Sequence, residues 1–219
     1  MARALIVHGG WEGHEPDRMA AVMAGLLTSG GAGVEVSDSL AAFDDATRLA
    51  GFDLIVPIWT MGTLSKERTA AVSEAVAAGT GLAGCHGGMC DAFRDNPLWQ
   101  FMTGAQWVAH PGDDGVRHWV RVVSDDPLVA GLPDFEVVTE QYYLHIDPAV
   151  KVHAVTDFPV AGGHHLPNGP VEMPVVFTKF WGAGRVYYNA LGHRAALFAE
   201  GPAREMMRRG LVWAMRGAG

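Results

Sequence analysis

Several histidines of this 219-residue sequence directly follow short apolar stretches that read as buried β-strands. The clearest examples are His8, His86 and His193. In an open parallel sheet, ligands bind outside the carboxyl ends of the strands, so these side chains are expected at one crevice. Imidazole can serve there as a general acid or base, as a hydrogen-bond donor to a developing charge, or as a metal ligand. The alternative for each is a hydrogen-bonded loop or core histidine.

His86 has the most distinctive surroundings, in the run Gly84-Cys85-His86-Gly87-Gly88. Glycines on both sides allow a strand to turn abruptly into a helix, and such an elbow exposes its central side chain. A helix that begins at Gly87 would place its positive end near the imidazole and lower the pKa of His86. The neutral ring suits a metal ligand or an electrophilic donor. The alternative is that these glycines serve packing and His86 fills a polar niche.

Two further groups could bring acid–base chemistry to the same place. His110 precedes Pro111, which holds the histidine backbone extended and fixes the direction of its side chain. Glu140 and Tyr142 lie two residues apart in a predicted strand over residues 135–145, so they share one face. If that face meets the crevice, a carboxylate and a phenol converge on the substrate. If it meets solvent, they are edge residues, and the sequence leaves both options open.

The predicted strand ends and loops also carry aromatic and polar side chains that would suit a sugar. The loop of residues 9–15 combines glycines with Trp11, His14 and two carboxylates just before a predicted helix. An aromatic ring can cover the face of a pyranose, although most tryptophans are packing residues. The candidate substrate-binding residues are His8, Trp11, His14, Trp59, Met61, Tyr142 and Trp181.

No short-range motif dictates a cofactor. The sequence has neither a His-Glu-x-x-His helix nor a Cys-x-x-Cys pair, so these motifs do not require a bound cofactor. Ligands from separate loops would escape such motif tests. A divalent metal such as zinc therefore remains an open option, with His14, His86, His110 and His193 as its candidate ligands.

The elements that would position these residues predict an α/β fold. Apolar stretches at 4–7, 34–36, 54–58 and 82–85 alternate with helical patterns, which is typical of parallel strands joined by crossover helices. Beyond residue 100, strands at 119–123, 135–145 and 152–156 follow with little helix, which favours an antiparallel or mixed extension. Strands at 175–180 and 186–191 bracket a turn and predict a hairpin. A final helix at 196–215 contains Gly201-Pro202, which predicts a break.

Composition limits the classes of protein and partner. With 49% hydrophobic and 18% charged residues, residues 1–219 are expected to form one globular domain. Sixteen basic against 24 acidic residues give a net charge of −8, which argues against nucleic acids and anionic membranes as partners. The apolar start is too short for a signal peptide or a membrane span, so we expect a cytoplasmic protein.

The two cysteines and one aromatic segment complete these expectations. Cys85 and Cys90 do not form a disulfide framework, which fits a reducing cytosol. Apolar side chains at Trp99, Phe101 and Met102 predict either a homodimer contact or packing on the sheet.

Several runs, in order along the chain, resemble the ThuA family of trehalose-utilisation-like proteins. They are Gly81-Leu-Ala-Gly-Cys-His-Gly-Gly, Gln106-Trp-Val-Ala-His-Pro, Glu140-Gln-Tyr and Gly184-Arg-Val-Tyr-Tyr-Asn-Ala-Leu-Gly-His. The resemblance implies a flavodoxin-like, class I glutamine amidotransferase-like three-layer sandwich, with a mostly parallel sheet and an antiparallel extension. Amidotransferases carry a nucleophilic cysteine at the centre of the elbow. Here His86 stands there, so amidotransferase chemistry is not implied.

The resemblance also implies a role in the breakdown of trehalose or a related disaccharide, with a small-molecule sugar as substrate. For a keto-sugar, Glu140 or His193 would abstract a proton beside the carbonyl while neutral His86 or a metal polarises the oxygen. The same residues could serve isomerisation, elimination or hydrolysis, so the sequence leaves the reaction type open. The candidate catalytic residues are His86, Glu140, His193 and His110. Two alternatives stay open, namely a non-catalytic sugar-binding or regulatory module and a peptidase or amidase that uses Cys85 or Cys90.

Overall fold

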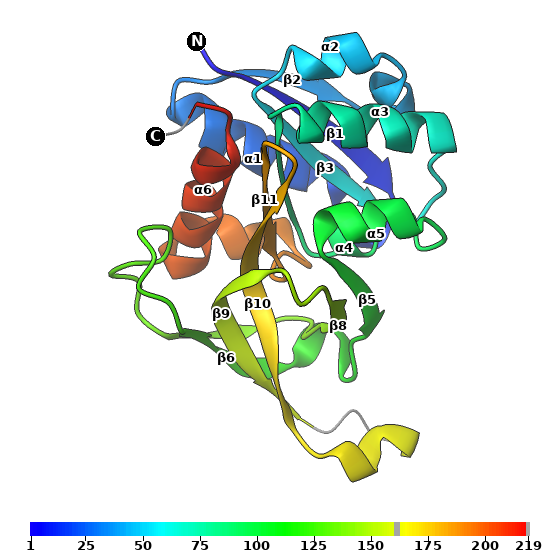
Figure 1. Cartoon of the computed structure of the whole chain (residues 1–219). Helices are drawn as coiled ribbons and strands as arrows, with labels where there is room; N and C mark the ends of the chain where they lie inside the picture. The colour runs from blue at the N-terminus through cyan, green and yellow to red at the C-terminus, as the bar shows by residue number, and fades with distance from the viewer. Residues whose placement is uncertain (160–162, 218–219) are drawn as a thin grey trace.

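The computed structural model describes residues 1–159 and 163–217, and within them the chain forms an α/β fold around a nine-stranded mixed sheet (Figure 1). The strand order is β2-β1-β3-β4-β11-β10-β9-β6-β7, and β5 and β8 form a separate pair. The strands are β1 (Arg3–Gly10), β2 (Gly33–Ser37), β3 (Leu54–Thr60), β4 (Gly81–Cys85), β5 (Ala105–Ala109), β6 (Arg117–Val122), β7 (Phe135–Val138), β8 (Tyr143–Ile146), β9 (Lys151–Phe158), β10 (Val171–Trp181) and β11 (Gly184–Asn189).

The parallel half consists of β2, β1, β3, β4 and β11. Helices cover both of its faces, which explains why the inner strands β1, β3 and β4 are apolar runs rather than alternating ones, whereas the edge strand β2 carries the exposed Glu35. Residues 4–7 of β1 and 54–56 of β3 are fully buried. The predicted alternation of strands and helices in the first half of the chain is confirmed.

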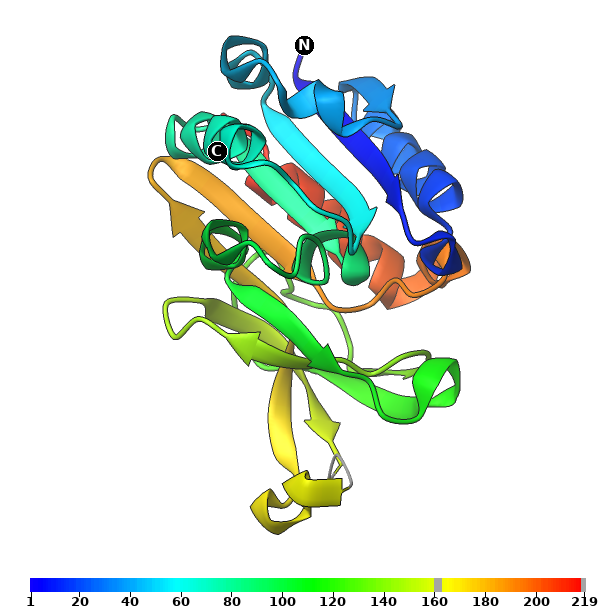
Figure 2. The same cartoon turned by 90° about the vertical axis from the view of Figure 1, so that its right-hand side faces the viewer.

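The helices lie on the two faces of the sheet. Figure 2 shows α1 and α6 together on one face and α3 on the other. The helices are α1 (Pro16–Ser29), α2 (Ala46–Ala50), α3 (Lys66–Ala77), α4 (Gly87–Cys90), α5 (Pro97–Thr103) and α6 (Gly201–Ala214). Pro16 opens α1 at a position where its missing N–H costs nothing, and Ser65 caps α3 by accepting a hydrogen bond from the Arg68 N–H.

The antiparallel half contains β10, β9, β6 and β7, with β10 pairing to β11. Trp181 and Gly184 are paired across the β10–β11 turn, so the predicted hairpin is confirmed. The far ends of β9 and β10 project beyond the rest of the molecule (Figures 1 and 2). The prediction of a mostly parallel sheet with an antiparallel extension is therefore correct.

One predicted element needs correction. The single strand expected over 135–145 is broken, because β7 ends at Val138 and β8 begins at Tyr143. Glu140 and Tyr142 therefore do not share a strand face but lie in the irregular connection between two different pairings. The break predicted at Gly201-Pro202 is confirmed, because a 3-10 turn over Ala195–Phe198 precedes α6 and Pro202 lies in the first turn of α6.

Glu205 of α6 is expected to make stability depend on pH in the acid range. Its carboxylate accepts hydrogen bonds from Arg208 and Arg209 at 2.7 and 2.8 Å, and these lower the pKa of Glu205 from 4.5 to about 2. A depressed folded-state pKa stabilises the protein above the unfolded-state value, and this contribution is lost as the pH falls through about 2. Because the side chain is 31% exposed, solvent screening limits the effect to about 1 kcal/mol.

Urea unfolding of wild type and Glu205→Gln at pH 6 and pH 2 measures this effect. The gap in unfolding free energy between the two proteins should close at the lower pH. A gap of the same size at both pH values would contradict the assignment.

Candidate functional site

A sharp elbow places His86 at the carboxyl end of β4. The residue has φ 48° and ψ −136°, a conformation that glycine adopts more readily than any residue with a side chain. Its N–H donates to the Asn189 carbonyl at 2.7 Å, which anchors the elbow to β11. The flanking glycines are needed for close packing, since a Cβ on Gly88 would lie 2.9 Å from the Ile58 Cα.

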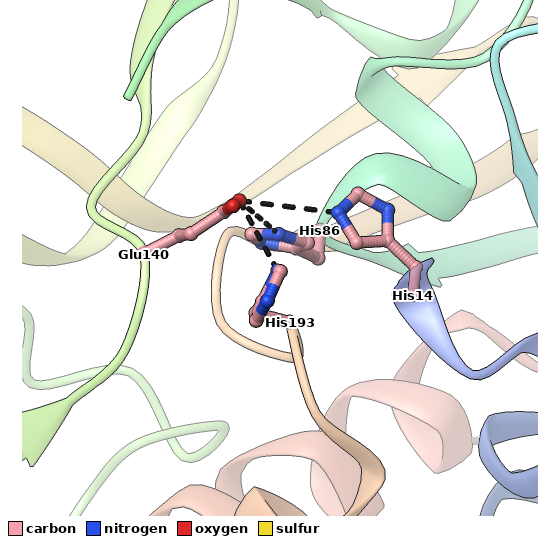
Figure 3. A group of neighbouring side chains, drawn as sticks. All are labelled: His14, His86, Glu140 and His193. Atoms are coloured by element: carbon pink, nitrogen blue, oxygen red, sulfur yellow. Dashed lines mark hydrogen bonds and ion pairs between the residues drawn. The ribbon is translucent and has the colours of Figure 1, made fainter. Parts of the chain in front are cut away.

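Four side chains from distant parts of the sequence meet at this elbow, as Figure 3 shows. They are His14 from the loop after β1, His86, Glu140 from the β7–β8 connection, and His193 from the segment after β11. The Glu140 Oε2 lies 3.1 Å from His86 Nε2, 3.2 Å from His193 Nδ1 and 3.9 Å from His14 Nε2. All four side chains are buried, with exposed fractions of 1–7%.

Each histidine of this His/Glu cluster is held at its other ring nitrogen. His86 Nδ1 donates to the Ala190 carbonyl at 2.8 Å. His14 Nδ1 lies 2.8 Å from the Thr60 hydroxyl, and His193 Nε2 lies 3.4 Å from the Asp114 carboxylate. Outer partners of this kind fix both the tautomer and the direction of an imidazole. The inner nitrogens of the three rings therefore all face Glu140.

Gly87 makes room for His14 beside the elbow. A Cβ at position 87 would come within 2.5 Å of His14 Nδ1 and 2.8 Å of the Thr60 hydroxyl. Only a residue without a side chain lets α4 begin so close to the His14–Thr60 pair.

Within the cluster, His86 and Glu140 have pKa values that favour different charge states, a neutral imidazole and an ionised carboxylate. Burial lowers the pKa of His86 to about 4, so the ring is neutral at pH 7. For Glu140, burial works to raise the pKa, but contacts with His14, His193 and His86 outweigh it and hold the pKa well below its usual value. The cluster thus combines an ionised carboxylate with a neutral imidazole. The direction predicted for the pKa of His86 is the same, but burial rather than the positive end of a helix is its main cause.

Aromatic rings surround the cluster. Tyr142 stacks on His86 with ring centroids 3.9 Å apart, and Trp11 meets His14 edge-on at 4.7 Å. His110 lies on the other side of the carboxylate, with its Nδ1 3.8 Å from Glu140 Oε1, and its side chain is 32% exposed. His110 and Trp11 are therefore partly open to solvent beside the closed cluster.

The structure does not bring four of the predicted binding residues into contact with the cluster. His8 lies within β1, with its Nδ1 3.2 Å from Asp17. Trp59 packs against Gly9 of β1 and against Gly62, and Met61 is 37% exposed with a positive φ. Trp181 packs on Phe101, and its indole N–H donates to Ser73 of α3 at 3.0 Å.

The set that could hold a metal ion differs from the predicted one by a single ligand. It consists of His14, His86, Glu140 and His193, whose ligand atoms lie within 4.8 Å of one another. Glu140 takes the place that we had predicted for His110. No pattern in the sequence indicates Asp114 or the Ala190 carbonyl as orienting groups, whereas Thr60, close to the end of a predicted strand, could have been a candidate.

Cys85 is expected to be inert toward alkylating reagents in the native protein. The thiol is 3% exposed, and burial raises its pKa to about 12, so almost no thiolate forms at pH 7. Iodoacetamide treatment followed by intact-mass measurement should show an unmodified native chain. The same treatment in urea should label both Cys85 and Cys90. Rapid labelling of the native protein would restore the cysteine-nucleophile alternative.

The fold and the elbow define the class of protein to which this chain belongs. The ThuA family model, described as trehalose utilisation, matches residues 3–214. The chain belongs to the ThuA family. No curated protein matches it.

Solved structures with related folds agree with this assignment. A putative ThuA-like protein from Bacteroides uniformis is 16% identical, with a TM-score of 0.76 over 97% of this chain and 91% of that chain. One from Parabacteroides merdae is 18% identical, with a TM-score of 0.74 over 97% and 89%. A β-galactosidase from Rahnella is 16% identical, with a TM-score of 0.63 over 98% of this chain but 30% of that chain. At these identities the likeness establishes the fold.

Among residues 1–159 and 163–217, no helix is both long and apolar enough to cross a bilayer.

Proposed function

We propose that this protein is a cytoplasmic enzyme of carbohydrate breakdown whose substrate is a disaccharide such as trehalose, or its keto derivative. Its membership of a family described by trehalose utilisation supports the substrate class. The observation that carries the proposal is the buried His/Glu cluster, in which an ionised Glu140 faces the inner nitrogens of three histidines. Such a site suits proton transfer and polarisation of an oxygen.

The reaction we favour is proton abstraction beside a keto group of the sugar. It needs a group that stabilises negative charge on the carbonyl oxygen and a base that takes the proton. The His/Glu cluster would supply the first, with zinc as the cofactor that its donor atoms suit. Half-exposed His110, next to Glu140 Oε1, is placed to move the proton, and Trp11 could cover a sugar face.

The second candidate is a sugar-binding or regulatory module without catalysis. The presence of His86 where the resembling amidotransferases carry their nucleophile favours it, because a scaffold that lost its chemistry would show the same change. A homodimer is a further proposal for either case, with exposed Phe101 as a candidate contact.

An isotope experiment separates the two functions. The purified protein is incubated in D₂O with trehalose and, separately, with 3-keto-trehalose, and the sugars are followed by NMR. An enzyme of the proposed kind should consume the keto sugar and introduce deuterium at the carbon beside the carbonyl. Calorimetric binding of either sugar with no chemical change would support the module instead. If neither conversion nor binding of either sugar is observed, the proposal that this protein acts on a carbohydrate is wrong.

A further inference from the structure

The protein atoms of the His/Glu cluster do not supply a hydrogen-bond donor for every acceptor. The Ala190 carbonyl can only accept, so His86 Nδ1 carries the hydrogen in that 2.8 Å bond. Its Nε2 then has a lone pair, unless the ring is a cation. That Nε2 lies 3.1 Å from Glu140 Oε2, which is itself an acceptor. Two acceptors therefore face each other in a buried space.

His193 repeats this arrangement independently. Both of its ring nitrogens face carboxylates, Nε2 facing Asp114 at 3.4 Å and Nδ1 facing Glu140 Oε2 at 3.2 Å, and a neutral ring carries a hydrogen on only one of them. Its Nδ1 is buried, has no hydrogen-bond partner, and lies 3.2 Å from Glu140 Oε2. The side chain is 4% exposed, so solvent offers little compensation. An unpartnered buried nitrogen thus points into the cluster.

Protonation of the inner ring nitrogens would satisfy these contacts only at a high cost in free energy. If the inner nitrogens of His86 and His193 carried hydrogen while their outer nitrogens also donated to Ala190 and Asp114, two buried imidazolium ions would share one carboxylate. Burying charge without matched partners is costly. A metal cation between the inner nitrogens and the carboxylate resolves every contact, because it accepts the lone pairs and offsets the carboxylate charge.

We infer that this cluster binds one divalent transition-metal ion of the zinc type through His14 Nε2, His86 Nε2, His193 Nδ1 and the carboxylate of Glu140. A tetrahedral zinc with bonds of about 2.0–2.2 Å holds its ligand atoms about 3.3 Å apart. The three histidine nitrogens lie 3.1, 3.2 and 3.9 Å from Glu140 Oε2, so only small side-chain movements are needed. Imidazole donors favour zinc-type ions over magnesium and calcium, which prefer oxygen.

Thr60, Ala190 and Asp114 complete the site as outer partners. Their oxygens fix the outer nitrogens of the three rings, as is usual for metal-bound histidines. Asp114 is a positioning residue, since it contacts His193 rather than the ion. It is also held by Arg194, whose Nε lies 3.1 Å from the same carboxylate oxygen.

The inference deepens the proposed function and rests on it only for the catalytic meaning of the ion. A bound zinc would supply Lewis-acid polarisation of a substrate oxygen. Glu140 would then be a metal ligand rather than the base, and the proton would pass to a residue outside the His/Glu cluster, such as His110.

Metal binding is tested without reference to activity. The protein is stripped with a chelator, titrated with zinc chloride by calorimetry, and, after dialysis, analysed for metal by mass spectrometry. We expect one zinc per chain. The single variants His86→Gln and His193→Gln should bind at least 100-fold more weakly, and Asp114→Asn about 10- to 100-fold more weakly. His145→Gln, which changes an exposed histidine of β8, should bind as wild type does.

Circular dichroism of each variant separates loss of binding from loss of the fold. The inference is overturned if the wild type takes up no zinc, or if folded His86→Gln and His145→Gln bind zinc equally. Stoichiometric zinc without sugar turnover would sink the proposed function alone. Turnover by a stripped protein that cannot bind zinc would sink the metal site alone.

Discussion

Replacing Glu140 by glutamine should lower turnover of the keto sugar by at least 100-fold while the protein stays folded. The carboxylate is the one group that all three histidines of the cluster face, at 3.1–3.9 Å. Glutamine keeps the shape but removes the charge, and its amide cannot both offset a cation and accept from several directions. Losses of about 10²–10⁴ are typical when a group of this kind is removed.

The matched control for this prediction is Glu136→Gln. Glu136 lies on β7, four residues from Glu140, but it is exposed and pairs with Arg117. Its change should leave turnover within twofold of wild type. Steady-state kinetics of both variants decide the matter. A Glu140→Gln enzyme that keeps more than about a tenth of wild-type turnover would place the reaction elsewhere.

Replacing Gly87 by alanine should disturb the cluster without entering it chemically. The new methyl group would lie 2.5 Å from His14 Nδ1 and 2.8 Å from the Thr60 hydroxyl, so the His14–Thr60 pair must move. We expect a loss of stability of about 1–3 kcal/mol, as is usual for overpacking. Turnover and zinc affinity should each fall about 10-fold or more, since an imidazole needs its outer partner to stay in place.

Gly25→Ala is the control for Gly87→Ala. A Cβ at Gly25 has no neighbour within 4 Å, and the residue lies inside α1. Alanine there should stabilise the protein by about 0.5–1 kcal/mol and leave zinc binding unchanged. Chemical unfolding and zinc calorimetry on both variants provide the comparison. Unaltered zinc binding by Gly87→Ala would contradict this prediction, because it would show that His14 can move away from the new methyl group and still bind the ion.

The parallel half of the fold could be predicted because the apolar pattern of each inner strand lies within a few consecutive residues. Its inner strands β1, β3 and β4 are buried on both faces and are therefore visible as apolar runs, such as residues 4–7 of β1. The rule that ligands bind at the carboxyl ends of parallel strands then singled out His86 and His193. The same rule also pointed to His8, which lies beside Asp17 outside the cluster, whereas His14 was a candidate because of the composition of the loop of residues 9–15. His14, His86 and His193 do meet in space.

The other half of the site depends on contacts that no local pattern records. Glu140 reaches the cluster because the chain leaves the β6–β7 pair and enters the β5–β8 pair between Val138 and Tyr143. A continuous strand was the simpler interpretation of that apolar sequence. Asp114 comes from an exposed loop and meets His193 across 79 positions of sequence, so its role depends entirely on tertiary structure.

The backbone of His86 has a consequence for the balance between stability and activity in this protein. A residue with a side chain at φ 48° and ψ −136° carries strain of about 1–3 kcal/mol, which glycine would not carry. The chain nevertheless has histidine at this one position, next to three glycines that relieve crowding around it. Selection for thermal stability alone would therefore favour loss of the imidazole, and a stabilised descendant with glycine at position 86 would be the expected form of a family member that had given up its site.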